Sequence, residues 1–400
     1  MNIGIFTDAY YPQINGVVTS TRLLKKELEN LGHKVTIVTV SDPKIKGKDI
    51  PNVLRLPSIP FWKLPNFRVG SIYSRKIMKE IKNLNLDIIH TQTEFSIGIF
   101  ARIVAKTLHI PLVHTYHTMY EDYTHYLAGK HMNKYAKEWA QKASKAICKN
   151  VDGVIVPTDK VKIALEGYGL EKDVHVVPTG IDFTPFNKEQ YEEDVLAMTR
   201  KEVGITADDA VVIFVGRIAK EKSIDTVIKS MPSVLENCPN AKLLIVGGGP
   251  ELDNLKEITQ NMNLNQKVLF TGEKPWEEIG RYYQMGDVFV SASTSETQGL
   301  TFTEAMAADL PVVAKYDTNL DGIMKDGVNG KFFREDGELA EILIELLNNT
   351  NLSSKLVENA HEMIKPLSSK CFGKSIEEVY SQVLQEHETS TSKIRFRFSH

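Results

Sequence analysis

The stretch "AVVIFVGRIAKEKSID", residues 210–225, decides the fold class. It begins with an unbroken apolar run that ends at Gly216, passes through a charged loop, and reaches a helix start near Ser223. A short run rich in Val and Ile, without polar alternation, is typical of a strand buried on both faces of a parallel sheet. The stretch therefore predicts one strand–loop–helix unit of an α/β domain.

Similar runs alternate with helical patterns along the chain and fall into two sets. The first set lies at 2–6, 34–40, 86–90, 111–116 and 152–157, and the second at 210–216, 241–248, 267–272, 287–293 and 311–315. Between the sets, prolines and a glycine interrupt both periods in residues 174–187, which we interpret as a hinge. We predict an α/β protein of two doubly wound, Rossmann-like domains that face each other across a cleft. The expected parts are an N-terminal domain (1–180), a C-terminal domain (181–375), and a C-terminal helix and tail (376–400) that could return to the N-terminal domain.

Composition favours a soluble protein of a reducing compartment. The 400 residues are 42% hydrophobic and 25% charged, which suits two domains with large cores. Three widely spaced cysteines, Cys148, Cys238 and Cys371, form no disulfide framework and no metal-binding pattern. The amino terminus lacks a basic signal region, and no apolar run approaches the ~20 residues of a membrane span.

The two halves of the chain carry opposite charge. Residues 1–150 hold 22 Lys and Arg against 11 Asp and Glu, and the remainder holds 26 against 40. A basic half indicates either an anionic partner or an attraction between the two domains.

Residues that follow strands are the candidates for chemistry, because ligands of doubly wound sheets bind at the carboxyl ends of the strands. After the first strand, Asn15 and Gly16 at a helix start could bind an anion or form an ordinary turn. Arg217 and Lys222 suit a diphosphate, although a solvated charged turn is an equal alternative. Three glycines around Gly248 permit close approach of a ligand or tight helix packing.

The stretch "SETQGLTFTEA", residues 295–305, places two glutamates on a third such loop and its helix. Glu296 lies in the loop and Glu304 about one turn into the helix, while amides near Gly299, Leu300 and Thr301 point at the same space. Carboxylates accept hydrogen bonds from sugar or ribose hydroxyls, so this arrangement suits a nucleotide-sugar. The alternative is a helix start decorated with favourable carboxylates.

These motifs together resemble glycosyltransferase family 4, retaining enzymes of the GT-B fold. The resemblance rests on the Glu-x7-Glu spacing of Glu296 and Glu304, on "GRIAKEK", "PQINGVV", "VHVVPTGID" and "EAMAADLPVVA", and it extends to about residue 380. Within the family, the sequence looks most like bacterial diacylglycerol glucosyltransferases. One departure is "KYDTNLDGIMKDG", where many members carry a glycine-rich stretch and a glutamate.

The resemblance implies a role for each matching residue. Glu304 would hold the ribose, Arg217 and Lys222 the diphosphate, and Gly16 a phosphate oxygen. Glu296, with the amides of Gly299, Leu300 and Thr301, would hold the sugar, and Gly248 would line the nucleotide-sugar site. His117 would lie near the reacting centre, whereas His114 falls within a strand and is expected to be structural. The implied reaction is front-face glucose transfer from UDP-glucose without a cofactor, and the lack of any Asp-x-Asp agrees with a site that needs no metal.

The acceptor is expected to be a diacylglycerol-type lipid, either 1,2-diacylglycerol or its monoglucosyl form. Residues 44–70 and 129–150 interleave basic and aromatic side chains, as anionic lipid surfaces favour. The acceptor or membrane contacts are then Trp62, Tyr120, Tyr123, Lys134, Lys137 and Trp139. A cytoplasmic protein attached to the inner face of the cell membrane follows, and nucleic acid is not expected because no binding module is recognisable.

Three alternatives remain open on the sequence. A family member could use a non-lipid acceptor, a UDP-sugar epimerase of GT-B shape would need no acceptor, and a silent binding protein would keep the nucleotide contacts without turnover.

Overall fold

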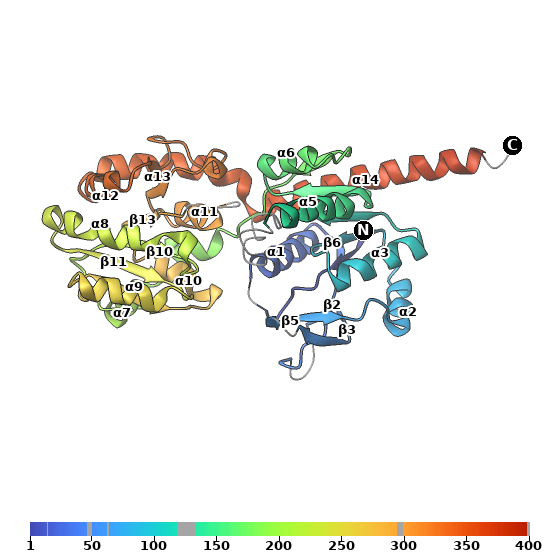
Figure 1. Ribbon diagram of the computed structural model, residues 1–400, viewed down its shortest axis with the longest axis horizontal. Helices are drawn as coiled ribbons and strands as arrows, with labels where there is room; N and C mark the ends of the chain where they lie inside the picture. The colour runs from blue at the N-terminus through green and yellow to red at the C-terminus, as the bar shows by residue number, and fades with distance from the viewer. Residues whose placement is uncertain (14, 46–49, 62–63, 118–132, 294–298, 398–400) are drawn as a thin grey trace. The chain divides into compact units, whose positions relative to one another are not determined.

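The computed structural model describes residues 1–13, 15–45, 50–61, 64–117, 133–293 and 299–397 (Figure 1). The chain divides into two compact units, the first formed by Met1–Gly180 with Ser369–His400 and the second by Ile181–Ser368. It thus leaves the first unit after Gly180 and returns at Ser369. Residues 369–375, which we expected in the second domain, lie with the first unit because the last helix already begins at Ser369.

The first unit is built on a seven-stranded parallel sheet with the order β3-β2-β1-β6-β7-β8-β9. Its strands are β1 (Asn2–Phe6), β2 (Lys34–Val40), β3 (Val53–Leu56), β6 (Ile88–Thr91), β7 (Leu112–Thr115), β8 (Gly153–Val156) and β9 (Val174–Val176). Successive side chains enter different cores, since Ile5 belongs to one buried cluster and Phe6 to another. Burial on both faces explains the unbroken apolar runs.

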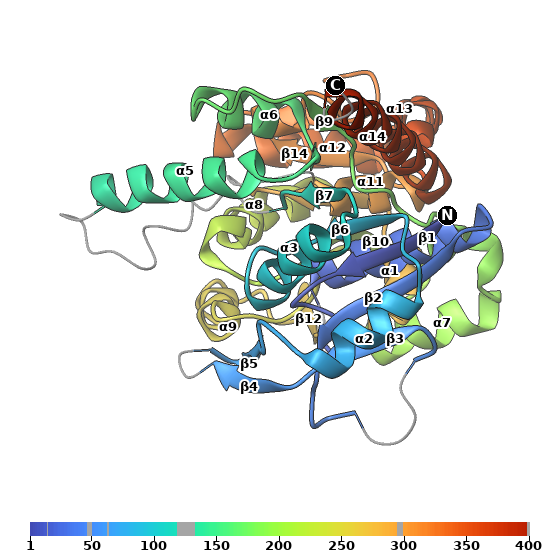
Figure 2. The same ribbon diagram turned by 90° about the vertical axis from the view of Figure 1, so that its right-hand side faces the viewer.

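Helices cover both faces of this sheet. They are α1 (Gly16–Asn30), α2 (Arg75–Asn83), α3 (Ser96–Leu108), α5 (Asn133–Lys149), α6 (Asp159–Gly167) and α14 (Ser369–Arg397). Leu28 of α1 and Ile376 of α14 belong to the cluster of one face, whereas Phe100 of α3 and Val161 of α6 belong to that of the other. Figure 2 shows this unit from the side on which α14 ends.

The helix α14 packs closely on α1. A Cβ atom at Gly373 would lie only 2.6 Å from Cβ of Glu27. The hydroxyl of Ser369 also donates a 2.7 Å hydrogen bond to Oε1 of Glu27, which is buried. Glycine is therefore required at 373 for the two helices to approach.

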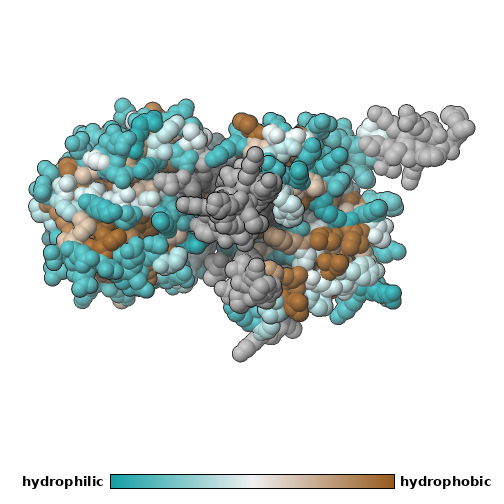
Figure 3. All heavy atoms as spheres, viewed as in Figure 1, coloured by the Kyte–Doolittle hydropathy of each residue, from teal (hydrophilic) through white to brown (hydrophobic). Residues whose placement is uncertain are grey.

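A small antiparallel hairpin, β4 (Ser58–Phe61) and β5 (Leu64–Gly70), follows β3. Arg68, on one face of the hairpin, links the hairpin to the end of β2, because its Nε donates a 2.8 Å hydrogen bond to the carbonyl of Ser41. On the other face Ile59 pairs with Val69, and these side chains are 69% and 41% exposed. Figure 3 shows such hydrophobic residues at the surface among hydrophilic ones.

The second unit repeats the architecture on a six-stranded parallel sheet with the order β12-β11-β10-β13-β14-β15. Its strands are β10 (Ala210–Val215), β11 (Ala241–Val246), β12 (Val268–Gly272), β13 (Val288–Ser291), β14 (Val312–Lys315) and β15 (Lys331–Phe333). Its helices are α7 (Glu193–Glu202), α8 (Ile224–Asn237), α9 (Leu252–Asn261), α10 (Trp276–Tyr283), α11 (Leu300–Ala307), α12 (Leu339–Asn348) and α13 (Thr350–Ile364). Short 3₁₀ turns are η1 (Thr184–Phe186), η2 (Lys188–Gln190), η3 (Lys220–Lys222), η4 (Thr318–Leu320), η5 (Asp336–Glu338) and η6 (Lys365–Leu367).

The predicted fold class of two doubly wound α/β domains is confirmed. Each of the ten apolar runs overlaps a strand of one of the two parallel sheets. The strands β3, β9 and β15 and the hairpin were not predicted. The first three are short strands at sheet edges, which take their structure from a neighbouring strand more than from their own pattern.

Candidate active site

In the second unit, the loops after β10 and β11 lie against each other. Arg217 follows β10 and is exposed, and Lys222 is partly buried in η3, immediately before α8. The amide of Ile218, next to Arg217, donates a 2.8 Å hydrogen bond to the carbonyl of Gly248. The fold thus brings the predicted phosphate-binding loop and the glycine-rich loop together.

Two of the three glycines are explained by this contact between loops. A Cβ atom at Gly247 would lie 1.9 Å from the carbonyl oxygen of Gly216, and one at Gly249 would lie 2.1 Å from that of Ile218. Both glycines also have positive φ angles, 146° and 155°. The contact between the two loops accounts for Gly247 and Gly249, and it differs from the helix packing that the sequence suggested.

The next loop leads to α11 and carries the candidate donor residues. Gly299 begins the helix in the left-handed conformation, with φ of 62°, so that Leu300 and Thr301 form its first turn. A Cβ atom there would also lie 2.8 Å from the side chain of Leu320. Glu304 lies one turn into α11, as predicted. Glu296 lies outside the described residues.

Glu304 has a buried partner that the sequence analysis missed. The hydroxyl of Tyr283, at the end of α10, donates a 2.8 Å hydrogen bond to Oε2 of Glu304. Burial raises the pKa of Glu304 to about 7, while the hydrogen bond from Tyr283 acts in the opposite direction. Burial beside this carboxyl also raises the pKa of Tyr283 well above its ordinary value. The carboxyl group is thus oriented and titrates near neutral pH.

The ring of Tyr283 is fixed by aromatic packing. Its centroid lies 5.5 Å from that of Phe186 in η1 and 6.0 Å from that of Phe289 in β13. Phe289 in turn stands edge-on to Phe302 of α11 at 5.6 Å. Such contacts favour a single ring orientation, which helps to hold the hydroxyl that serves Glu304.

In the first unit, His117 lies two residues beyond β7 and is partly buried. Its Nε2 lies 2.7 Å from Oε1 of Gln92, which follows β6. The pKa of His117 is lowered to about 4, mainly by burial; Glu94 acts in the opposite direction and nearby His114 in the same one. The imidazole is therefore neutral at physiological pH and can form hydrogen bonds without carrying a charge.

His114 is structural, as expected. It lies within β7 and is fully buried, with Nδ1 2.9 Å from the hydroxyl of Thr91 and Nε2 3.5 Å from Oε1 of Glu94. Gln92 and Glu94 were not predicted, although their place just after β6 is a signal that could have identified them.

Asp8, two residues after β1, is another buried residue that was not predicted as part of the site. Its carboxylate accepts hydrogen bonds from the hydroxyls of Thr93 and Ser96 and from the amide of Ile97 at 3.1 Å. Burial raises the pKa of Asp8, and these donors partly offset the effect. Asp8 therefore fixes the start of α3 beside the strand ends.

Gly16 is the first residue of α1 and is exposed. The side chain of Asn15 caps this helix, since its Oδ1 accepts a 3.0 Å hydrogen bond from the amide of Val18. A Cβ atom at Gly16 would meet no atom within 4 Å, so protein packing does not require glycine there.

Several predicted acceptor or membrane residues cannot be placed. Trp62, Tyr120 and Tyr123 lie outside the described residues, and so do the side chains of Lys134 and Lys137 at the start of α5. Trp139 of the same helix is described, and it is 74% exposed. In the described part of the chain, no helix is long and apolar enough to cross a bilayer.

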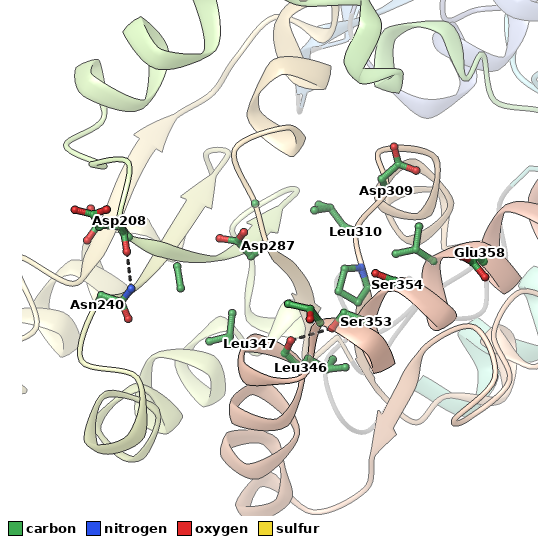
Figure 4. A pocket seen from close by; sticks show the side chains of 16 residues that line it. Asp208, Asn240, Asp287, Asp309, Leu310, Leu346, Leu347, Ser353, Ser354 and Glu358 are labelled. Carbon is green, nitrogen blue, oxygen red and sulfur yellow. Dashed lines mark hydrogen bonds between the residues drawn. The ribbon is translucent and has the colours of Figure 1, made fainter. Parts of the chain in front are cut away.

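The second unit also contains a cavity of about 640 Å³ (Figure 4), and its lining includes none of the candidate site residues. It is lined by Ala210 at the start of β10, by Asp287 just before β13, and by Pro311 just before β14. These positions mark the amino ends of the strands, opposite the loops that carry Arg217 and Glu304. The cavity is therefore not the candidate active site.

Comparison with known proteins identifies the class. Two doubly wound domains with polar loops after their strands match solved GT-B structures, among them Anabaena HepE in complex with UDP-glucose (TM-score 0.72, 18% identity, 95% of this chain and 99% of that chain). The sucrose-phosphate synthase of Thermosynechococcus elongatus matches with a TM-score of 0.73 at 21% identity, over 96% of this chain and 100% of that chain. At these identities the likeness establishes the fold alone.

Sequence comparison establishes the family. Residues 14–184 match the family model described as Glycosyltransferase Family 4, and residues 197–363 match Glycosyl transferases group 1. The chain is 37% identical to the alpha-monoglucosyldiacylglycerol synthase of Acholeplasma laidlawii, over 98% of this chain and 100% of that protein. It is also 37% identical to the synthase of that name from Streptococcus pneumoniae, over 95% of this chain and 85% of that protein. The chain therefore belongs to glycosyltransferase family 4, as its motifs predict.

Proposed function

We propose that this glycosyltransferase moves glucose from UDP-glucose to a diacylglycerol-type lipid, with retention of configuration at the anomeric carbon. The observation that carries the proposal is the 37% identity, over nearly the whole chain, to synthases named for a monoglucosyl-diacylglycerol product. 1,2-Diacylglycerol is accordingly the first acceptor to test, and monoglucosyl-diacylglycerol the second.

The second unit is proposed to bind UDP-glucose. Arg217 and Lys222 would grip the diphosphate, with Gly248 on the adjoining loop beside it. Glu304, when ionised, would accept hydrogen bonds from the ribose hydroxyls. Glu296 and the amides of Gly299, Leu300 and Thr301 would hold the sugar. The Tyr283–Glu304 pair supports this assignment, because it gives the ribose contact a fixed orientation.

The first unit is proposed to supply Gly16 and His117. The amide of Gly16 would contact a phosphate oxygen at the start of α1, where the helix dipole favours an anion. His117, neutral because burial lowers its pKa to about 4, would bind a sugar hydroxyl near the reacting carbon.

The reaction proceeds by front-face substitution. The acceptor oxygen bonds to the anomeric carbon on the side from which the diphosphate departs, and its proton passes to a phosphate oxygen of the leaving group. Arg217, Lys222 and the helix N-termini stabilise the negative charge that develops on that group. We propose that no metal is required, because these cations and amides supply the stabilisation that a metal would give.

Membrane attachment is proposed through the basic first unit. Trp139 is 74% exposed on a lysine-rich helix, and Ile59 and Val69 expose apolar surface on the hairpin. Aromatic and cationic side chains together suit an anionic lipid surface. We place the protein on the cytoplasmic face of the cell membrane, where UDP-glucose and diacylglycerol meet.

The test is transfer of labelled glucose from UDP-glucose in mixed micelles that contain diacylglycerol, monoglucosyl-diacylglycerol or no lipid acceptor, with and without anionic phospholipid. Alpha-linked glucolipid product supports the proposal and shows which glucose is added. Bound UDP-glucose without lipid product contradicts it and favours a non-lipid acceptor, whereas interconversion of free UDP-sugar without any acceptor points to an epimerase.

A further inference from the structure

Gln92 lies buried between two histidines at the carboxyl ends of β6 and β7. Its side chain is 2% exposed, and its two amide atoms face different rings. Oε1 lies 2.7 Å from Nε2 of His117. Nε2 of Gln92 lies 3.3 Å from Nδ1 and 3.1 Å from Nε2 of His90.

These two distances place the amide nitrogen over the ring of His90. An atom nearly equidistant from both ring nitrogens, at hydrogen-bond distance, cannot lie in the ring plane because it would collide with the carbon between them. An N–H group over an aromatic face is attractive, while a carbonyl oxygen there would face the negative side of the ring. The contact with His90 therefore sets the amide nitrogen toward His90 and the amide oxygen toward His117.

His90 is itself held in place and neutral. Its Nδ1 lies 2.7 Å from the hydroxyl of Tyr380 on α14, and its Nε2 lies 2.7 Å from the hydroxyl of Thr115. Burial lowers the pKa of His90 well below its ordinary value, and the neighbouring His114 and His117 act in the same direction. A neutral ring keeps the electron-rich face that the amide of Gln92 contacts.

The orientation of Gln92 decides the tautomer of His117. An amide oxygen can only accept, so Nε2 of His117 carries the ring proton. In a neutral imidazole the other nitrogen, Nδ1, then holds the lone pair and is an acceptor.

We propose that Gln92 is a positioning residue, which holds His117 in the Nε2–H tautomer and so presents Nδ1 as the acceptor for a hydroxyl of the donor sugar. The part that concerns the sugar rests on the proposed function; the tautomer does not. His90 contacts the amide nitrogen of Gln92, and Tyr380 holds the ring of His90 in place.

The experiment measures the ring of His117 directly. Two-bond ¹H–¹⁵N NMR spectra of the full chain, without substrate, report the tautomer and the pKa of each histidine, and His117→Gln identifies the signal of interest. The variants are Gln92→Leu, which removes the acceptor, and Gln92→Glu, which keeps an oxygen there and adds charge. Gln260→Leu, exposed on α9, is the matched control.

The wild-type ring is expected to be in the Nε2–H form, and Gln92→Leu to shift it toward a mixture. Gln92→Glu should keep the Nε2–H form and raise the pKa of His117 by about 1 unit or more, in the presence of the same neighbours Glu94, His90 and His114. An Nδ1–H ring in the wild-type protein, or a ring unchanged by Gln92→Leu, would overturn the proposal. If Gln92→Leu does not fold, the proposal is tested by the tautomer of His117 in the wild-type protein and by the pKa of His117 in Gln92→Glu.

Kinetics then test the part that concerns the sugar. Gln92→Leu should lower kcat roughly 10- to 100-fold while the KM for UDP-glucose stays within about twofold, because the misplaced group acts on the reacting sugar. Gln92→Glu should have a higher kcat than Gln92→Leu at a pH where His117 is neutral. Gln260→Leu should keep the wild-type kcat. Normal kcat in a Gln92→Leu variant with a disturbed ring would refute this part. A wild-type protein with the expected tautomer but no glucosyl transfer would count against the proposed function and support the tautomer assignment.

Discussion

The hydroxyl of Tyr283 donates a hydrogen bond of 2.8 Å to Oε2 of Glu304, and the two residues come from different helices, α10 and α11. The pair explains how a carboxyl group can stay oriented in a largely apolar setting. It also argues against the alternative that Glu304, the second glutamate of the Glu-x7-Glu motif, is only a carboxylate that favours a helix start, because Glu304 accepts a hydrogen bond from a buried hydroxyl.

Removal of the Tyr283 hydroxyl should weaken the binding of UDP-glucose. In Tyr283→Phe the carboxyl of Glu304 loses the interaction that favours its ionised form, so the KM for UDP-glucose should rise roughly fivefold, for about 1 kcal/mol of lost hydrogen bonding. Tyr282→Phe is the matched control, since Tyr282 is the adjacent buried tyrosine. Steady-state kinetics at pH 7.5 compare the two, and equal KM values for both variants would argue against the role of Tyr283.

Donor binding should also depend on pH through Glu304. Burial raises its pKa to about 7, so the carboxylate that we propose as the acceptor for the ribose hydroxyls is present above that pH and is lost below it. UDP-glucose should therefore bind about tenfold more weakly at pH 6 than at pH 8, as expected for one group with that pKa. Calorimetry across this range provides the measurement, and Glu304→Gln should abolish the dependence; a slope that persists in that variant would assign it to another group.

The folding stability should depend on pH in the opposite direction, because ionisation of Glu304 favours UDP-glucose binding but disfavours the folded state. The pKa of Glu304 is raised from 4.5 in the unfolded chain to about 7 in the folded protein, so the favourable contribution of the protonated form is complete below pH 4.5 and is lost as pH rises through 7. Glu304→Gln should consequently raise the midpoint of thermal unfolding at pH 8 and change it little near pH 5. Glu358→Gln, exposed on α13, serves as the control. A variant less stable than the wild type at pH 8 would show that ionised Glu304 stabilises the fold.

The contact between α1 and α14 should not tolerate a side chain at 373. A Cβ atom at Gly373 would lie 2.6 Å from Cβ of Glu27, so Gly373→Ala should destabilise the first unit by about 1–3 kcal/mol. Gly167→Ala, at the end of α6, adds the same methyl group where no atom lies within 4 Å and should be neutral or stabilising. Denaturant unfolding compares the two, and equal midpoints would mean that α14 shifts without cost.

Lipid binding should depend on Trp139. Trp139→Ala should reduce sedimentation with anionic vesicles severalfold without changing the midpoint of thermal unfolding, because this side chain is 74% exposed. Ile163→Ala on α6, where the side chain is 66% exposed, controls for the loss of any exposed apolar group. Equal wild-type sedimentation with neutral and anionic vesicles at low salt would rule out the electrostatic part of the proposal.

The central strands were predictable because their burial on both faces leaves an unbroken apolar run, as in 210–216 and 241–248. The loops at the ends of these strands then pointed to Arg217, Lys222 and Glu304 as candidate site residues. The edge strands β3, β9 and β15 were not predictable, because pairing with a neighbour rather than pattern determines them.

The residues that contact the candidate site residues were harder to predict than the candidates themselves. Tyr283 lies 21 positions from Glu304 and Gln92 lies 25 from His117, and no local spacing connects either pair. Their roles follow from the order in which strands and helices pack. The glycines at 247 and 249 show the converse, since a pattern that could signify a ligand is explained by two loops in contact.

Because the chain returns to the first unit only at Ser369, that unit is discontinuous in sequence and the second is an insertion within it. During synthesis, Leu24 and Leu28 of α1 and the ring of His90 stay without part of their packing until α14 emerges, because α14 supplies Ile376 and Tyr380 and is translated after the whole second unit. The second unit, complete by residue 368, can fold on the ribosome before the first. A ribosome that stalls before α14 would release a chain with a folded insert inside an unfinished host domain, and such a chain would expose apolar surface to chaperones and proteases.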